Sequence, residues 1–267
     1  MRTLSRAVGS KDIGGEPIPN VFRAFELNKV IIRRSEVSMI AGTPGAGKST
    51  LSLAIALRAK VPTLYISADT NAHTMAMRLL SMITNLSQTD AERMLIDDVE
   101  ETRRVINENS GHIFWSFDSA PTLGDLDQEV AAFEELWGCS PTLIVVDNLM
   151  DISNDGAEEF AGMRSTMKEL KYLARDTNAA ILVLHHTKES YVGNPCQPRS
   201  ALQGMVAQLP ALICTVGSNA PGYIAVAPVK NRYGKADATG DTVFWLQFNP
   251  EIMDVSDIKE NHERTNS

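Results

Sequence analysis

The stretch Gly42-Thr43-Pro44-Gly45-Ala46-Gly47-Lys48-Ser49-Thr50 decides the fold of this chain. It follows an apolar run, residues 37–41, and it opens a helical pattern, residues 51–57. Strand, glycine-rich loop and helix in this order are the context in which G-x-x-x-x-G-K-[ST] forms a phosphate-binding loop. The glycines let successive backbone N–H groups point at one anion. The helix that opens at Lys48 adds the positive end of its dipole.

The residue types in this stretch predict a nucleotide site. Lys48 should reach the β- and γ-phosphates as a point charge, and the Ser49 hydroxyl should bind Mg²⁺. We therefore expect ATP and Mg²⁺ as ligands, with residues 42–50 as the binding loop. The alternative is an ordinary glycine-rich turn between a strand and a helix.

The composition is typical of one large α/β domain. The chain has 267 residues, of which 43% are apolar, enough for a single core. Its net charge of −8 gives no overall basic field, so contacts with DNA would depend on local clusters of Lys and Arg.

The three cysteines lie far apart and predict neither a disulfide framework nor a zinc site. Without a signal core or a run of eighteen apolar residues, we expect a cytoplasmic protein with no membrane partner.

The order of apolar runs predicts the fold class. From residue 30, strands alternate with amphipathic helices, which is typical of a mostly parallel sheet covered on both faces. Residues 209–248 predict three further strands as an antiparallel extension, and residues 90–109 predict a solvated helix. We divide the chain into an N-terminal arm or disordered tail (1–29), an ATPase domain (30–250) and a frayed acidic tail (251–267).

Polar residues stand where the predicted strands end, namely Asp69, Asp147 and the pair His185-His186. Ligands of open parallel sheets collect at the carboxyl ends of the strands, so these residues should meet the phosphate loop. Asp147 would hold Mg²⁺ together with Ser49. Asp69 would orient or deprotonate the attacking water, and His186 would sense the γ-phosphate.

Each of these assignments has a plainer alternative. Asp147 could cap a helix after its strand, and Asp69 could cap the helix that begins at Asn71. His186 could be no more than a histidine at a strand end.

Lys230 and Arg232 alternate in an extended segment that continues to Gly234, so their side chains should point the same way. This pattern predicts a finger that enters the nucleotide site of a neighbouring subunit and neutralises charge during phosphoryl transfer. Such fingers raise rates by roughly 10³–10⁵. The alternative is a solvated pair in a β-turn. A finger in trans makes assembly a condition of activity, so we expect a homo-oligomer.

Taken in order, these motifs resemble the RecA superfamily, most specifically the motor domain of DnaB-like hexameric helicases, over residues 35–248. Residues 42–50 are similar to the Walker A loop of that family, and residues 143–150 to its Walker B strand. Residues 66–70, 184–188 and 230–234 resemble its catalytic-glutamate, sensor and Lys-x-Arg finger elements. The resemblance implies a RecA-like fold, a hexameric ring or a filament, and single-stranded DNA held against the loops at 150–156 and 188–199. The catalytic residues it implies are Lys48, Asp69, Asp147, His186, Lys230 and Arg232.

The chain also departs from this family. Asp69 is one methylene shorter than glutamate, which predicts slow turnover. We expect this chain to lack the helical domain that binds primase, so it looks more like a stand-alone phage-encoded ATPase in the cytoplasm of a bacterial host. The two loops contain few cations, and DNA binding follows from the resemblance.

We expect an ATP-driven, DNA-stimulated motor of replication or recombination. One alternative is a recombination or strand-annealing protein whose DNA affinity is switched by nucleotide. Another is a RecA-fold ATPase that acts on a protein partner.

Overall fold

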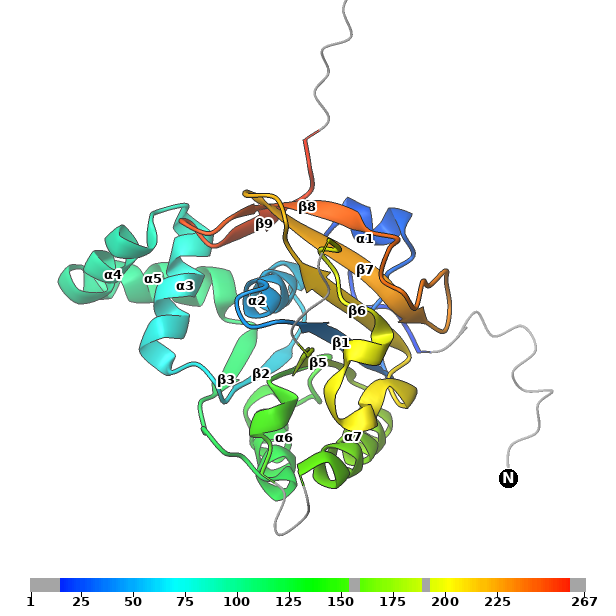
Figure 1. Ribbon diagram of the computed structural model, residues 1–267. Helices are drawn as coiled ribbons and strands as arrows, with labels where there is room; N and C mark the ends of the chain where they lie inside the picture. Colours follow the sequence, from blue (N-terminus) through cyan, green and yellow to red (C-terminus); the bar gives the residue numbers. More distant parts are fainter. Residues whose placement is uncertain (1–14, 154–158, 189–192, 260–267) are drawn as a thin grey trace, which may run out of the picture.

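A nine-stranded sheet with the order β3-β2-β4-β5-β1-β6-β7-β8-β9 forms the centre of the molecule (Figure 1). The computed structural model describes residues 15–153, 159–188 and 193–259. The strands from β3 to β6 in this order are parallel, and β7, β8 and β9 continue the sheet in antiparallel fashion. The predicted α/β RecA-like fold is confirmed. The strands are β1 (Val37–Gly42), β2 (Thr63–Ser67), β3 (Ile113–Ser116), β4 (Leu143–Asp147), β5 (Ala180–His186), β6 (Leu212–Gly217), β7 (Tyr223–Asn231), β8 (Phe244–Asn249) and β9 (Asp254–Ser256).

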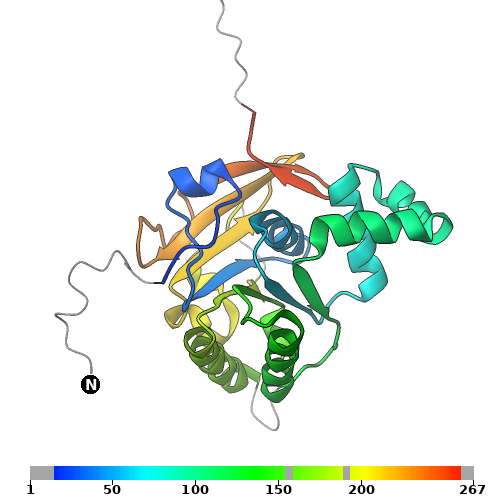
Figure 2. The same ribbon diagram turned by 180° about the vertical axis from the view of Figure 1, so that it is seen from behind.

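Helices cover both faces of the sheet (Figures 1 and 2). One face carries α1 (Arg23–Leu27), α2 (Lys48–Ala59) and α3 (Ala72–Thr84), and the other carries α6 (Leu123–Trp137) and α7 (Glu159–Asp176). Alternate residues of the central strands enter the two cores, as Ile40 and Met39 of β1 do. Short 3₁₀ helices, η2 (Leu149–Asp151), η3 (Arg199–Ala201) and η4 (Gln203–Gln208), lie in the connections. The sheet is therefore buried on both sides, and its strand ends lead into the site.

The polar segment at 90–109 differs from expectation because it forms parts of two helices. These are α4 (Gln88–Asp97) and α5 (Val99–Ser110), and they pack on α3 beside the sheet (Figure 1). Asp98 separates them with φ −130° and ψ 58°, outside the helical region. The Thr102 hydroxyl donates to the Met94 carbonyl across the break.

The described ends of the chain pack against the ATPase domain rather than extending from it. Ile18, Phe22 and Phe25 belong to the core on the α2 face, although they lie in the predicted arm. Val255 of β9 is buried in the same core, within the segment predicted to be frayed. Asp257 accepts hydrogen bonds of 2.8 Å from the first backbone N–H groups of α1, which ties the two ends together. Residues 1–14 and 260–267 lie outside the described part.

Among the described residues, no helix has both the length and the apolar character that crossing a membrane requires.

Candidate nucleotide-binding site

The phosphate loop connects β1 to α2, and packing against β6 and β7 determines its shape. Gly45 and Gly47 have φ of +75° and +88°, a region that glycine enters at little cost. A Cβ on Gly47 would come within 2.7 Å of Cδ1 of Ile224, and one on Gly42 within 2.5 Å of the Val216 carbonyl oxygen. These positions therefore need glycine for steric reasons in addition to any contact with phosphate.

The Lys48 side chain is buried and folds over the loop. Its Nζ donates to the carbonyl oxygens of Gly42 and Thr43, at 3.1 and 3.0 Å. Burial lowers the pKa of Lys48, while the carboxylates of Asp147 and Asp69 raise it. The loop thus holds the Lys48 ammonium group where the phosphate oxygens of a bound nucleotide would accept hydrogen bonds from it.

Asp147 ends β4 beside the phosphate loop. Its carboxyl group is almost completely buried, and burial raises its pKa to about 6, against the opposing effect of hydrogen bonds from Ser49 and Tyr65. The following peptide bond is cis. Asn148, not Asp147, caps η2, so the cap alternative does not apply to this helix.

The pairing of Ser49 and Asp147 suits Mg²⁺, which prefers hard oxygen ligands. The Ser49 hydroxyl and the Asp147 carboxylate are two such ligands, and they lie within hydrogen-bond contact of each other. The donor set therefore fits the predicted ion.

A buried chain of hydroxyl groups behind Asp147 was not predicted. The Tyr65 hydroxyl shares a hydrogen bond of 2.8 Å with Ser52 Oγ and donates to Asp147. The Ser49 carbonyl oxygen, 3.0 Å from Ser52 Oγ, is an alternative acceptor for the Ser52 hydroxyl. A single tyrosine within a buried apolar strand was the available signal, because a buried phenol needs a partner.

Asp69 and His186 lie at the mouth of the same site. Asp69 is exposed just beyond β2, and Asn71 caps α3 by accepting from Thr74 N at 2.9 Å. The alternative that Asp69 caps this helix is therefore wrong. His186 pairs with Gly42 in the sheet, and burial lowers its pKa, which favours the neutral imidazole. His185 is fully buried and its Nε2 lies 3.0 Å from the Gln203 carbonyl oxygen.

A cleft of about 330 Å³ brings these groups together. Its lining unites the phosphate loop with Asp69, Asp147 and His186, in the arrangement predicted from the strand ends; their catalytic roles remain predictions. The cleft is lined by Pro44, Gly45, Gly47, Lys48, Ser49, Thr50, Asp69, Thr70, Arg78, Gln88, Asp147, Asn148, His186, Phe248 and Met253.

Several residues of this lining were missed because they come from distant segments. Phe248 and Met253 lie on either side of the turn from β8 to β9 and offer an apolar end to the cleft. Gln88 holds this turn, since its Nε2 donates to the Pro250 carbonyl at 2.9 Å and its backbone N–H to Glu251 at 3.0 Å. Arg78 adds a cation from the same chain. No local sequence motif marks these positions.

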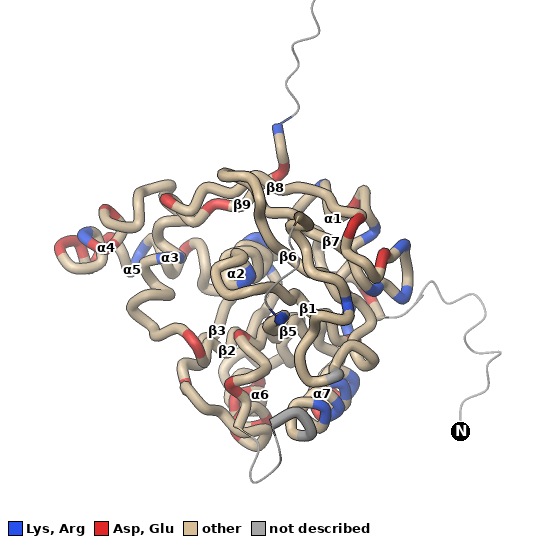
Figure 3. Tube along the Cα trace, in the orientation of Figure 1, with Lys and Arg blue, Asp and Glu red and all other residues tan. Residues whose placement is uncertain are grey.

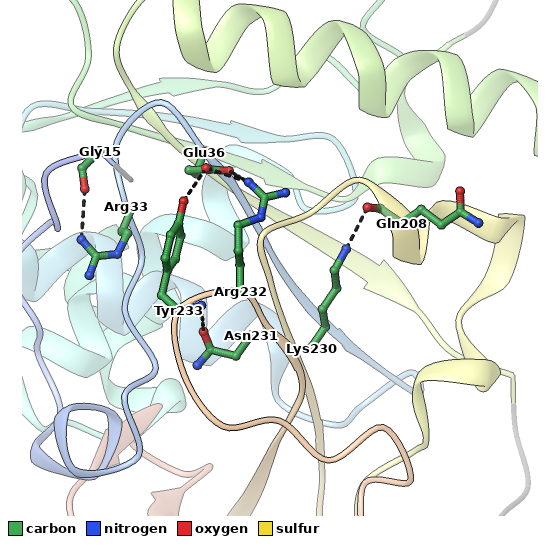
Figure 4. A network of polar contacts seen from close by, with 8 residues as sticks. All are labelled: Gly15, Arg33, Glu36, Gln208, Lys230, Asn231, Arg232 and Tyr233. Atoms are coloured by element: carbon green, nitrogen blue, oxygen red, sulfur yellow. Dashed lines mark hydrogen bonds and ion pairs between the residues drawn. The ribbon is translucent and has the colours of Figure 1, made fainter. Parts of the chain in front are cut away.

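Lys230 and Arg232 lie outside this cleft. They are near the amino ends of the parallel strands, whereas the cleft is at the carboxyl ends. β7 is antiparallel to β6, which is parallel to β1, so β7 ends near the beginning of β1. The two side chains extend in the same general direction (Figure 4), and each has its own partner. Nζ of Lys230 donates to the carbonyls of Ala207 and Gln208, at 2.9 and 2.8 Å, and Arg232 pairs with Glu36. They are therefore not a freely solvated pair, and one chain does not bring them to its own phosphate loop.

A basic stripe on α7 is visible in Figure 3 and was also missed. Arg164, Lys168, Lys171 and Arg175 recur at helical spacing, and all are exposed except Lys171, which is half-buried. Lys171, Arg199 and Arg232 each lower the pKa of Lys230, although burial has the larger effect. The spacing was readable in the sequence, whereas the proximity of the stripe to Lys230 depends on the tertiary fold.

The fold and the loop together define a RecA-like P-loop ATPase. Residues 26–190 match the AAA domain family, and the chain belongs to that family. It is 31% identical to the gene 65 protein of Mycobacterium phage L5, over 97% of this chain and 99% of that protein. It is 23% identical to the DNA repair protein RadA of Treponema pallidum (strain Nichols), over 78% of this chain but 38% of RadA.

Among solved structures, one described as a DnaB-like replicative helicase and its interactions with primase is similar in fold. The TM-score is 0.79 at 15% identity, and the match covers 96% of this chain and 67% of that chain. The predicted resemblance to the RecA superfamily and to the DnaB-like ATPase domain is confirmed.

Proposed function

We propose that this ATPase is a motor that acts on single-stranded DNA as a ring or filament of identical subunits, in the cytoplasm of a bacterial host. One observation carries the proposal. One cleft is lined by the phosphate loop, Asp69, Asp147 and His186, whereas Lys230 and Arg232 lie near the opposite ends of the parallel strands. A second subunit is needed to bring those cations to a nucleotide.

The chemistry follows from the positions of the side chains. Backbone N–H groups of the loop and Lys48 bind the β- and γ-phosphates, and Phe248 with Met253 packs against the base. Ser49 and Asp147 would hold Mg²⁺, which would supply positive charge beside the phosphate oxygens. Asp69, at the open mouth, orients the attacking water, and the imidazole N–H of His186 donates a hydrogen bond to the γ-phosphate. Arg232 and Lys230 of a neighbouring subunit neutralise the charge that develops on transfer.

Two kinds of observation support single-stranded DNA as the substrate on which the proposed motor acts. The similar proteins include a DnaB-like replicative helicase and the DNA repair protein RadA. The α7 stripe also adds a row of cations to a chain of net charge −8, near Lys230. The predicted DNA loops lie partly outside the described residues, at 154–158 and 189–192.

The test combines hydrolysis with strand separation. Single-stranded DNA should raise the ATPase rate, and a forked duplex should be separated only in the presence of ATP. If DNA changes neither the rate nor assembly, a protein partner replaces DNA as the target.

A second candidate is a recombination or annealing protein, and the sequence similarity to RadA favours it. It predicts efficient annealing of complementary strands without ATP, together with no strand separation on the fork. The same forked and complementary substrates distinguish the two functions.

A further inference from the structure

Arg232 is held by a carboxylate that directly precedes the strand carrying the phosphate loop. Nη1 of Arg232 donates to both oxygens of Glu36, at 2.9 and 3.2 Å (Figure 4). The Tyr233 hydroxyl donates to Oε1 of the same carboxylate, at 2.9 Å. The Glu36 side chain is 14% exposed and that of Arg232 is 42% exposed. A mostly buried anion therefore holds one nitrogen of a guanidinium whose side chain is partly open to solvent.

The geometry leaves the other donors of Arg232 available. Both contacts with Glu36 use Nη1, and the contacts of the described residues give Nε and Nη2 no acceptor. A guanidinium can bind a carboxylate at one edge and phosphate oxygens at the other, because it has five N–H donors in one plane. An arginine held in this way loses less rotamer freedom when it meets a phosphate.

The neighbours of Arg232 in the chain contact the segment that precedes β1, and its own backbone N–H bonds to the residue that precedes β6. The Arg232 N–H donates to the Ala211 carbonyl at 2.9 Å, and Nδ2 of Asn231 donates to the Lys29 carbonyl at 2.9 Å. The guanidinium of Arg33 lies 5.0 Å from the centre of the Tyr233 ring. Residues 29–36, which lead into β1, thus form a platform for residues 231–233.

We propose that Glu36 is the positioning residue for Arg232. It fixes the guanidinium at the subunit surface with its phosphate-binding edge outward, ready for the nucleotide of the neighbouring subunit. This inference rests on the proposed function, since it requires a site shared between subunits. Glu36 contacts no nucleotide in this arrangement and acts through Arg232.

Mixed oligomers provide a test that a merely structural role would not pass. Glu36→Ala should lower kcat by about 10- to 100-fold, the usual cost of a displaced catalytic group, and leave nucleotide binding by its own loop intact. Mixing it with Lys48→Ala subunits should restore activity, because an intact loop then meets an intact Arg232 at some interfaces. Mixing it with Arg232→Ala subunits should restore none, because both variants lack a working finger.

Two further variants control for folding. Glu36→Gln keeps the shape and one acceptor oxygen, so it should bind nucleotide normally and fall between wild type and Glu36→Ala in kcat. Glu101→Ala removes a carboxylate that pairs with Arg104 on α5, an ion pair of the same kind remote from both sites, and should leave kcat unchanged.

Different outcomes separate the inference from the function on which it rests. Activity restored by mixing Lys48→Ala with Arg232→Ala supports the shared site. If mixing Glu36→Ala with Arg232→Ala also restores activity, the role of Glu36 is wrong although the shared site stands. The role of Glu36 is equally wrong if Glu36→Gln and Glu36→Ala both retain wild-type kcat. If Lys48→Ala and Arg232→Ala fail to restore each other in oligomers that contain both, the shared site itself is wrong, and the inference is overturned with it.

Discussion

The phenolic hydroxyl of Tyr65 donates a hydrogen bond of 3.3 Å to Oδ2 of Asp147, deep behind the phosphate loop. This contact joins a side chain of β2 to the proposed metal ligand of β4, its neighbour in the sheet. It favours the ionised carboxyl group, and it lowers a pKa that burial raises. After burial and the hydrogen bond from Ser49, Tyr65 therefore contributes to how readily Asp147 carries the charge that Mg²⁺ needs.

Removal of this hydroxyl should shift the pH dependence of ATP hydrolysis. In Tyr65→Phe, Asp147 loses a donor and its pKa should rise above about 6, so the acid limb of kcat/KM moves to higher pH. We also expect a loss of about 1 kcal/mol in the free energy of unfolding, because the buried hydrogen bonds are lost. Tyr223→Phe, at an exposed tyrosine of β7, is the matched control. An unshifted acid limb would show that Asp147 does not control it.

Asp147→Asn should stabilise the protein while abolishing its activity. The folded-state pKa of Asp147, about 6, lies above its ordinary value of 3.8, so the folded protein binds the extra proton between these values. Stability from this group is present at low pH and is lost as pH rises through about 6. At pH 7, asparagine should raise the free energy of unfolding by up to about 3 kcal/mol, since one pKa unit is worth 1.36 kcal/mol.

Urea denaturation at pH 7 and pH 4.5, with Mg²⁺-dependent ATPase assays, measures both effects. The gain should shrink at the lower pH. Asp127→Asn, an exposed carboxylate on α6, should change stability by less than about 0.5 kcal/mol. Destabilisation by Asp147→Asn at pH 7 would contradict the raised pKa.

Asp69→Glu should speed turnover. Asp69 is exposed at the mouth of the cleft, and one more methylene would carry its carboxylate toward the phosphates. We expect a severalfold rise in kcat with little change in nucleotide affinity, and Asp69→Asn should remove most hydrolysis, by about 10²-fold or more. Steady-state kinetics together with binding of an ATP analogue separate the two quantities. A loss of turnover in Asp69→Glu would mean that Asp69 is not the base.

The α7 stripe should contribute to DNA affinity through phosphate contacts. Replacing both Lys168 and Lys171 by alanine should weaken binding of single-stranded DNA of any sequence, and the slope of log K against log salt should fall by about 1.4 in magnitude. Fluorescence anisotropy over a salt series measures this slope. Arg103→Ala, on exposed α5, is the control for loss of charge. An unchanged slope in the double variant would remove α7 from the DNA surface.

Local signals in the sequence were enough for the fold class and for the centre of the cleft. The glycine-rich motif defined the turn from β1 to α2, because glycine adopts positive φ at little cost and leaves room for Val216 and Ile224. Uninterrupted apolar runs defined the buried parallel strands, and parallel strands bring their carboxyl ends to one edge. The sequence alone therefore predicts that Asp69, Asp147 and His186 lie together.

Only the tertiary structure decided which residues complete the site and where the cations point. Gln88, Phe248 and Met253 reach the cleft from distant segments, Tyr65 supports Asp147 from behind it, and Glu36 meets Arg232 from the other end of the chain. Periodicity reports which face of an element is buried, but it does not report the register or direction of strands that are distant in sequence. The antiparallel pairing of β7 with β6 is such a long-range choice, and it places Arg232 at the edge opposite the phosphate loop.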